Sequence, residues 1–260
     1  MSIPKLDKTK FEEVQRNIFL MKGISLDTPI CRYIDLDILV LLLQNNTFYL
    51  NRRRMFSDRN EHGWTGNFNR FMMPVSSDED KEEKENERNY YKSQFKEDYD
   101  NRKAIADWLT ICFTENTTEN YFFWRAYTHH RFGIRICTSI KNFCDSIMQN
   151  NDYEFFIGKI EYGQNCEKLC LNNKITTYAF AKTMPYQDER EIRVYVFPIN
   201  NSHPNNLYNG IWLKIDPNTL IEGITLSPFM LPMFRNEIVK LFPNFKTKFT
   251  QSKLVENKVQ

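Results

Sequence analysis

The segment PYQDEREIRVYVFP, residues 185–198, constrains the fold more than any other part of the chain. Charged and apolar residues alternate in it ahead of a β-branched and aromatic run, which is typical of a strand with two different faces. Glu189, Glu191 and Arg193 would share one face, because alternate side chains of a strand point the same way. The aliphatic side chains between them would face a hydrophobic core. The pattern therefore predicts a strand that carries two carboxylates and a guanidinium on one face.

The rest of the chain predicts a mixture of helices and strands. We expect helices at residues 11–21, 36–43, 117–130, 140–148, 175–182 and 227–242. Runs rich in β-branched and aromatic residues predict strands at 30–34, 47–50, 108–116, 132–139, 153–163, 210–215 and 223–226. Thr117 or Thr118 would cap the third helix, Ser227 would cap the last, and Asn45-Asn46 would end the second. Because several strands follow one another without long crossovers, we expect an α+β fold with largely antiparallel strands in two small sheets with flanking helices.

No linker rich in proline, glycine or serine divides the chain. With 260 residues, of which 41% are apolar and 15% aromatic, it can bury one sizeable core, so we expect a single domain over residues 1–260. Residues 76–103 are dense in charges of both signs and poor in aliphatic residues, which predicts a charged helical or mobile insertion. Residues 248–260 are expected to form a polar C-terminal tail.

The charge balance indicates no bulk field toward nucleic acid or anionic membranes. There are 35 basic and 33 acidic residues, for a formal net charge of +2, so such a partner would need a local patch. The longest apolar run, at residues 38–43, is far shorter than the roughly 18 residues of a membrane span. Residues 1–17 carry charges of both signs where a secretory signal would be apolar. We therefore expect a cytoplasmic protein with no membrane partner.

The spacing of histidine and cysteine argues against a metal site. His129 and His130 are adjacent and would diverge in regular structure, while Cys166 and Cys170 have no second ligand pair at a usual interval. The six cysteines lack a C-x-x-C pair and are interpreted as buried thiols. A glycine-rich dinucleotide or phosphate loop and a G-x-S-x-G motif are also missing from the sequence. We expect no metal cofactor.

Two constellations remain as candidates for chemistry. The first extends the opening strand backward as K-x3-Y-x2-E-x-E-x-R, which comprises Lys182, Tyr186, Glu189, Glu191 and Arg193. Its two carboxylates repel each other, so keeping both ionised requires a cation such as Arg193 or a ligand hydroxyl. The alternative interpretation is a solvated strand face with alternating charges.

The second constellation is CFTENTTENYFFWRAYTHHRFGIRI, residues 112–136. A strand, a helix that carries Trp124 and Tyr127, and a turn at Gly133 follow one another closely there. Aromatic residues at helical spacing usually belong to a core, so this constellation taken alone favours packing over binding.

Taken together, these motifs resemble a widespread bacterial family of cytosolic proteins built on a domain of unknown function. The shared features in the second half are Phe113-Thr114, Trp124 with Tyr127, Gly133, Lys182, Tyr186, Glu189, Glu191 and Arg193. The N-terminal part is similar through Arg32, Tyr33, Phe56, Ser57 and Asp58. The resemblance covers roughly residues 30–242, with the charged segment as an insertion.

The order of the expected elements is also similar to that of the ADP-ribosyltransferase superfamily, which is an analogy at the level of the fold. This resemblance implies NAD as substrate, with a cofactor-binding set of Arg32, Tyr33, Trp124, Tyr186 and Arg193. It implies a catalytic set of Glu191, Glu189 and Tyr127. The superfamily's middle Ser-Thr-Ser element is missing from this chain, and Arg54 or Arg59 could replace Arg32 as the ligand of the anion.

The roles that the resemblance implies are chemically coherent. Arg32 would bind the diphosphate or a ribose, and Tyr127 or Trp124 would stack on nicotinamide. Glu191 would bond a ribose hydroxyl and stabilise an oxocarbenium-like transition state, while Glu189 would position or deprotonate the accepting nucleophile.

Three functions compete at this point. The first is an NAD-using ADP-ribosyltransferase-like or NAD-hydrolysing effector, a toxin or an antiviral-defence protein, with a macromolecular acceptor and a regulatory partner protein as further expectations. The second is a protein- or nucleic-acid-binding module of a defence system, with a basic surface made of Arg52, Arg53, Arg54, Arg125, Arg131 and Arg135. The third is nuclease chemistry, which would need a divalent metal and an aspartate near the two glutamates.

Overall fold

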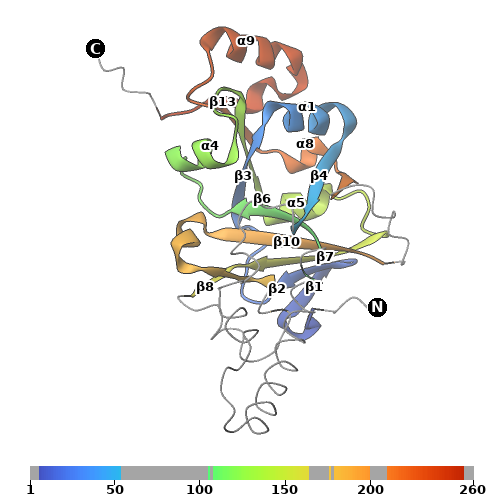
Figure 1. The fold of residues 1–260 in the computed structure, drawn as a ribbon. Helices are drawn as coiled ribbons and strands as arrows, with labels where there is room; N and C mark the ends of the chain where they lie inside the picture. Colours follow the sequence, from blue (N-terminus) through green and yellow to red (C-terminus); the bar gives the residue numbers. More distant parts are fainter. Residues whose placement is uncertain are drawn as a thin grey trace, which may run out of the picture.

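The computed structural model describes residues 6–53, 108–163, 179–199 and 210–254, together with Ile105 and Thr176. In these residues, eleven strands form one large sheet and two further strands form a small parallel pair, with helices packed around them (Figure 1). The expected α+β fold with largely antiparallel strands is confirmed. The expectation of two small sheets is wrong, because most of the strands join a single sheet.

The elements alternate irregularly between strand and helix along the chain. The large sheet contains β1 (Phe11–Gln15), β2 (Ile18–Met21), β3 (Pro29–Asp35), β4 (Thr47–Arg52), β5 (Leu109–Thr114), β6 (Gly133–Ser139), β7 (Tyr153–Lys159), β10 (Glu191–Pro198), β11 (Gly210–Lys214), β12 (Gly223–Leu226) and β13 (Phe249–Gln251). The small sheet contains β8 (Glu161–Gly163) and β9 (Ala181–Thr183). The α-helices are α1 (Leu36–Asn45), α4 (Tyr121–Tyr127), α5 (Ile140–Ser146), α8 (Pro217–Leu220) and α9 (Pro232–Leu241). Short 3-10 helices are η1 (Lys8–Lys10), η4 (His130–Phe132), η5 (Met184–Glu189) and η6 (Pro243–Lys248).

The large sheet divides at its central strand β5. The main strand order is β1-β2-β7-β10-β5-β3-β6-β12-β13, and β4 with β11 forms a side branch. One edge of β5 pairs with β10 along its whole length. On the other edge, Thr114 lies opposite Cys31 of β3, whereas Thr110 lies opposite Asn51 of β4. Two strands thus share one edge of β5, and the sheet continues as two branches.

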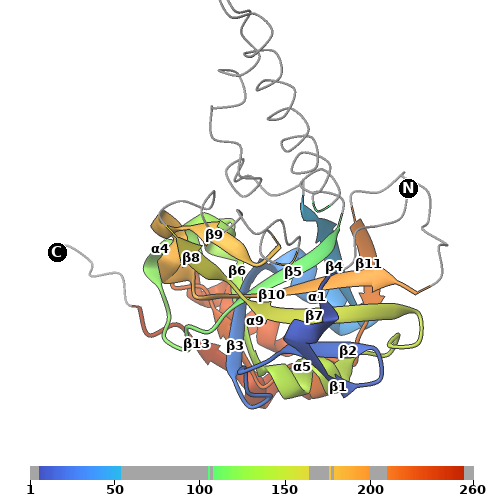
Figure 2. The same cartoon turned by 90° about the horizontal axis from the view of Figure 1, so that it is seen from below.

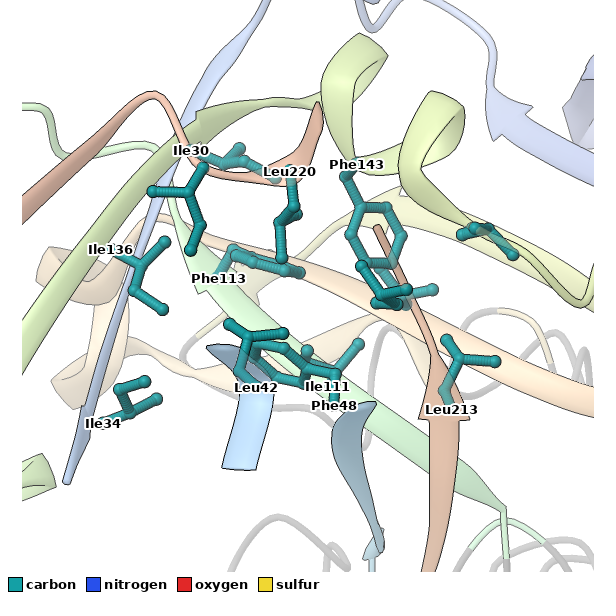
Figure 3. Close-up of a cluster of buried hydrophobic side chains, with 14 of the residues drawn as sticks. Ile30, Ile34, Leu42, Phe48, Ile111, Phe113, Ile136, Phe143, Leu213 and Leu220 are labelled. Carbon is teal, nitrogen blue, oxygen red and sulfur yellow. The ribbon is translucent and has the colours of Figure 1, made fainter. Parts of the chain in front are cut away.

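The branches and helices enclose the main hydrophobic core, shown in Figure 3. The side chains labelled there come from β3, α1, β4, β5, β6, α5, β11 and α8, and none is more than 5% exposed. Full burial of one such side chain contributes about 1.5–3 kcal/mol. The apolar face of β10, with Ile192, Val194 and Val196, belongs to the same core, as its alternation predicts.

The prediction of a helix at residues 11–21 is wrong. The segment forms an antiparallel hairpin in which Phe11 pairs with Met21. The chain reverses near Asn17, whose φ of 62° is a left-handed conformation that asparagine tolerates better than most residues. Ile18 packs in the main core, whereas Phe11 packs on Phe156 in a second cluster. Tertiary contacts on both faces of the hairpin therefore stabilise strands in place of the expected helix.

Other elements follow the sequence more closely. The strands expected at 30–34, 47–50, 108–116, 132–139, 210–215 and 223–226 are present, as is the helix at 36–43. That helix ends at Asn45, and Asn46 takes a left-handed φ of 53°. The strand expected at 153–163 is two strands in different sheets, β7 and β8.

Three helix ends differ from expectation. Asn120 caps α4 in place of Thr117 or Thr118, because its Oδ1 accepts from the backbone N–H of Phe122 at 2.8 Å. The last helix begins at Pro232 and not after Ser227, whose hydroxyl instead accepts from the N–H of Phe229 at 3.2 Å. Residues 181 and 182, which end the helix expected at 175–182, lie on β9 instead.

The C-terminal segment contributes to the sheet. Residues 249–251, within the expected tail at 248–260, form β13 and pair in parallel with β12. Residues 255–260 and the charged segment 76–103 lie outside the described residues, as do Phe56, Ser57 and Asp58. Within the described ranges, no helix has the length and apolar character needed to cross a membrane.

Candidate functional site

The ionic face predicted for β10 is present and completely buried. Arg193 is 0% exposed and Glu191 is 3% exposed. The guanidinium grips the carboxylate with two parallel hydrogen bonds, Nε to Oε1 at 2.6 Å and Nη2 to Oε2 at 3.0 Å. Such bidentate pairs fix the orientation of both groups. The carboxylate of Glu191 is therefore held in one position on this face.

The remaining donors of Arg193 also find partners, which offsets the cost of burying a charge. Nη1 donates to the carbonyl oxygen of Ala179 at 3.1 Å. The hydroxyl of Tyr195, two residues further along the same face, donates to that carbonyl at 2.7 Å. Burial raises the pKa of Tyr195, so this hydroxyl stays protonated.

Glu189 does not lie on the strand, which corrects the prediction of three ionic residues on one strand face. It ends η5, and Arg190 then takes a left-handed φ of 43° before β10 begins. The carboxylate of Glu189 nevertheless lies near that of Glu191, and the ammonium of Lys182 lies between the two carboxylates. The ammonium of Lys182 is 2.7 Å from Oε2 of Glu189 and 3.5 Å from Oε2 of Glu191. One cation thus bridges both carboxylates.

Lys182 belongs to β9 and its side chain is only 6% exposed. It also lies 4.5 Å from the ring centroid of Tyr186, a cation–π distance. We call Lys182, Glu189, Glu191 and Arg193 the paired-carboxylate cluster. Lys182 and Arg193 thus place two positive charges beside the two carboxylates.

Tyr127 of α4 joins the cluster from a distant part of the chain. Its hydroxyl donates a hydrogen bond to Oε1 of Glu189. Tyr127 is 48% exposed as a residue, while its hydroxyl contacts the carboxylate. Burial, followed by the negative charge of Glu189, raises the pKa of Tyr127. Figure 2 shows α4 on the same side of the molecule as β8 and β9.

Arg32 of β3 approaches the cluster from another direction. Its Nη1 donates to the carbonyl oxygen of Cys112, and its guanidinium carbon lies 5.8 Å from the ring centroid of Phe48. Burial lowers the pKa of Arg32, and the charge of Glu191 acts in the opposite direction. The guanidinium of Arg32 therefore lies within the electrostatic reach of the Glu191 carboxylate.

Tyr33 and Trp124 lie in a separate aromatic cluster. Tyr33 points to the opposite face of β3 from Arg32, and its ring meets Trp124 edge-on with the centroids 4.9 Å apart. Trp124 is 0% exposed, and its Nε1 donates to Glu119 at 3.3 Å. Both residues pack with Phe123. The structure thus gathers Arg32, Tyr127, Tyr186, Glu189, Glu191 and Arg193 and keeps these two apart from them.

Two further residues support the site: Thr114, which belongs to the Phe113-Thr114 motif, and Tyr162, which the sequence did not single out. The hydroxyl of Tyr162 on β8 accepts the backbone N–H of Glu191 at 2.9 Å. Thr114 at the end of β5 donates its hydroxyl to the carbonyl oxygen of Glu189 at 2.6 Å. Tyr162 reaches the site because it pairs with Lys182 across the small sheet. No local sequence pattern predicts that pairing.

Three of the six arginines of the expected basic surface are buried. Arg52, Arg53 and Arg135 are 8%, 2% and 5% exposed, while Arg125 and Arg131 are exposed. Arg54 lies outside the described residues, as does Arg59. Nη2 of Arg135 bonds the carbonyl oxygens of the loop at residues 116–117. The buried arginines Arg52, Arg53 and Arg135 therefore do not form part of a basic surface.

No group of three or more histidine, cysteine, aspartate or glutamate side chains suited to a metal ion occurs within the described residues. Comparisons of the chain with protein-family models, with curated proteins and with solved structures found no match.

Proposed function

We propose that the paired-carboxylate cluster is the catalytic centre of an NAD-using enzyme that transfers ADP-ribose to a macromolecule or hydrolyses NAD. The observation that carries the proposal is the gathering of two carboxylates on one buried ammonium, at 2.7 and 3.5 Å, next to a tyrosine hydroxyl. Three consecutive elements, β9, η5 and β10, supply the ammonium and the carboxylates, and the distant helix α4 supplies the tyrosine hydroxyl. A solvated strand face would not require this convergence.

The two carboxylates would take different roles. Cleavage of the bond between nicotinamide and ribose sends the bonding electron pair to nicotinamide and leaves an oxocarbenium-like ribose. Glu191, oriented by Arg193, would stabilise that positive charge. Glu189 has the more exposed side chain, 14% against 4%, and would accept the proton of the incoming water or acceptor group.

The groups around the carboxylates fit this assignment. Tyr127, which keeps its proton, would hold Glu189 in place and expose its ring for stacking on nicotinamide. Tyr186, partly buried above Lys182, offers a second ring. Arg32 would contribute positive charge for the diphosphate. An enzyme of this type would act as a toxin or an antiviral effector, because it consumes NAD or modifies a macromolecule.

The decisive experiment measures nicotinamide release from NAD by the wild type and by Glu191→Gln, with and without cell lysate. We expect Glu191→Gln to lower the rate at least about 100-fold, the usual effect of removing one electrostatic stabiliser of a transition state. Because Glu191 is buried against Arg193, Glu189→Gln is a second test at a more exposed position. Glu237→Gln on α9, whose side chain is 65% exposed, is the matched control.

Each outcome has a distinct meaning. A rate that needs lysate indicates transfer to an acceptor, whereas release without lysate indicates hydrolysis. Far-ultraviolet circular dichroism and thermal unfolding would confirm that the variants fold. A folded wild type without release in either condition, or folded variants with full activity, would contradict the proposal.

Exposed aromatic residues on α4, η4 and α9 favour one second candidate, a binding module for nucleic acid or protein. Phe122 of α4 is 74% exposed, and Phe132 and Phe234 are each 47% exposed with ring centroids 6.4 Å apart. Arg125 lies 5.8 Å from the ring centroid of Tyr121. Aromatic rings beside a cation form stacking platforms for single-stranded nucleic acid. Binding of a labelled oligonucleotide that weakens with salt and with Phe122→Ala would support this function, and no dependence on either would contradict it.

A further inference from the structure

Two cysteine thiols face each other across neighbouring strands of the large sheet. Cys31 of β3 and Cys137 of β6 are directly opposite in the antiparallel register, and their sulfur atoms are 2.8 Å apart. Directly opposite residues of antiparallel strands have Cα atoms about 4.5–5.5 Å apart, within the range that a disulfide spans. Both are free thiols in the structure. The backbone therefore already brings the two sulfur atoms close enough for a bond.

The two thiols differ in environment. Cys31 is 2% exposed, whereas Cys137 is partly exposed. On the far side of Cys137, β12 presents Gly223, where an added Cβ would come no closer than 4.0 Å to the Cβ of Cys137. A small reagent would thus meet Cys137 first, over a position that carries no side chain.

The surroundings also favour a thiolate at Cys137. The hydrogen bond from the thiol of Cys31 lowers the pKa of Cys137, and Arg135 lowers it further, while burial and the charges of Glu222 and Glu119 oppose this effect. Nη2 of Arg135 lies 3.1 Å from the sulfur of Cys31. A partly exposed thiol whose thiolate is favoured by a neighbouring thiol and by a nearby positive charge is the environment in which cysteine reacts with oxidants.

We propose that Cys137 and Cys31 form a peroxide-reactive dithiol that closes to a cross-strand disulfide, with Cys137 as the attacking residue and Cys31 as the resolving residue. The thiolate of Cys137 attacks one oxygen of hydrogen peroxide, breaks the O–O bond and becomes a sulfenic acid, while the hydroxide that leaves takes up a proton to give water. The sulfur of Cys31 then attacks the sulfur of Cys137, forms the S–S bond and releases a second water. Two thiols lose two electrons and two protons, and one peroxide is reduced to two waters.

This modification lies close to the paired-carboxylate cluster but does not depend on its function. Cys31 precedes Arg32 on β3, and its backbone lies opposite Thr114, which bonds the carbonyl of Glu189. A disulfide between Cys31 and Cys137 would therefore link β3, the strand that carries Arg32, covalently to β6.

The test is mass spectrometry of the folded full-length chain after treatment with hydrogen peroxide and digestion with trypsin. We expect peptides 23–32 and 136–141 to become linked, with the loss of two hydrogens, and dithiothreitol to separate them. In Cys31→Ser, Cys137 should stop at the sulfenic acid and react with dimedone. In Cys137→Ser, the buried Cys31 should remain a free thiol.

Cys144→Ser removes a buried cysteine outside the pair and is the matched control, which should leave the linkage unchanged. Serine is close in size to cysteine, so thermal unfolding would verify that all variants fold. Linkage that forms only after denaturation, or dimedone labelling at Cys31 in place of Cys137, would overturn the proposal. So would folded wild-type protein in which both thiols stay free at a peroxide excess of about 100-fold.

Discussion

At the scale of single residues, the buried ion pair of Glu191 and Arg193 is the contact whose disruption should cost most in free energy of unfolding. Both side chains are withdrawn from water, and each has the other as a bidentate partner. Removing one member of such a pair leaves a buried charge without compensation and typically costs about 3–5 kcal/mol. The exposed pair of Lys240 and Glu237, with side chains 70% and 65% exposed, carries no such penalty because water screens it.

The first prediction concerns this pair. Arg193→Met should lower the free energy of unfolding by about 3–5 kcal/mol, because the Glu191 carboxylate loses two hydrogen bonds in a buried place. Urea denaturation measures the effect. The double variant Arg193→Met with Glu191→Gln should recover part of the loss, since it removes the orphaned charge. A single variant as stable as the wild type, or a double variant less stable than the sum of the two single changes, would show that the pair is not buried as described.

The second prediction concerns Tyr127. Tyr127→Phe keeps the half-exposed ring and removes only the hydroxyl that donates to Glu189. If the proposed NAD chemistry holds, kcat should fall about 10-fold or more with little change in thermal stability. Because burial and Glu189 raise the pKa of Tyr127, activity of the wild type should show no loss from its ionisation near pH 10. A loss of activity near pH 10 that disappears in Tyr127→Phe would contradict the protonated-donor role.

At the scale of secondary-structure elements, the pairing of β4 with β11 depends on one glycine. A Cβ added at Gly210 would lie 2.0 Å from the backbone oxygen of Leu50 on the opposite strand. A backbone atom cannot move aside as a flexible side chain does. The close approach is therefore available only to glycine.

The third prediction follows from this contact. Gly210→Ala should lower the free energy of unfolding by about 1–3 kcal/mol, the usual cost of overpacking, by pushing β11 away from β4. Gly223→Ala on β12 is the matched control, because its Cβ would have its nearest neighbour at 4.0 Å, an ordinary contact. We expect that change to alter stability by less than about 1 kcal/mol. Equal urea midpoints for the two variants would contradict the contact.

At the scale of the whole molecule, several tyrosines with raised pKa values link stability to alkaline pH. Burial raises the pKa of Tyr33 to about 12 and is also the main cause of raised pKa values for Tyr127, Tyr162 and Tyr195. The folded chain therefore holds these hydroxyl protons more tightly than the unfolded chain. The stabilisation is complete below the ordinary tyrosine pKa of about 10 and is lost as the pH rises toward the raised values.

The fourth prediction is an alkaline loss of stability. The free energy of unfolding, measured in urea at a series of pH values, should fall steadily above about pH 10 as the unfolded chain releases protons that the folded chain retains. Tyr195→Phe removes one of these groups and should make the fall less steep. A pH-independent free energy between about pH 10 and 11 would show that the tyrosines ionise as readily in the folded state.

Local sequence pattern was sufficient where one face of an element meets the core. The alternation at residues 191–196 predicted which side chains of β10 are apolar and which are ionic, and Asn46 ended α1 as expected. The same reasoning was wrong for residues 11–21, because apolar side chains at helical spacing there pack into two different clusters from a hairpin. A sequence pattern indicates how apolar each position is, but it does not indicate which other segment packs against that position.

The sequence by itself determined the mixed α+β class, the strand that carries Glu191 and Arg193, and the grouping of Lys182 with the two glutamates. Only the tertiary structure decided that Glu189 reaches the site from a 3-10 helix, that Tyr127 joins it, and that Tyr33 and Trp124 pack elsewhere. The physical reason is that β10 lies between β7 and β5, and other groups around the site come from β3, β8 and α4, segments far from β10 in the chain. Contacts between such segments depend on strand order, which no local spacing encodes.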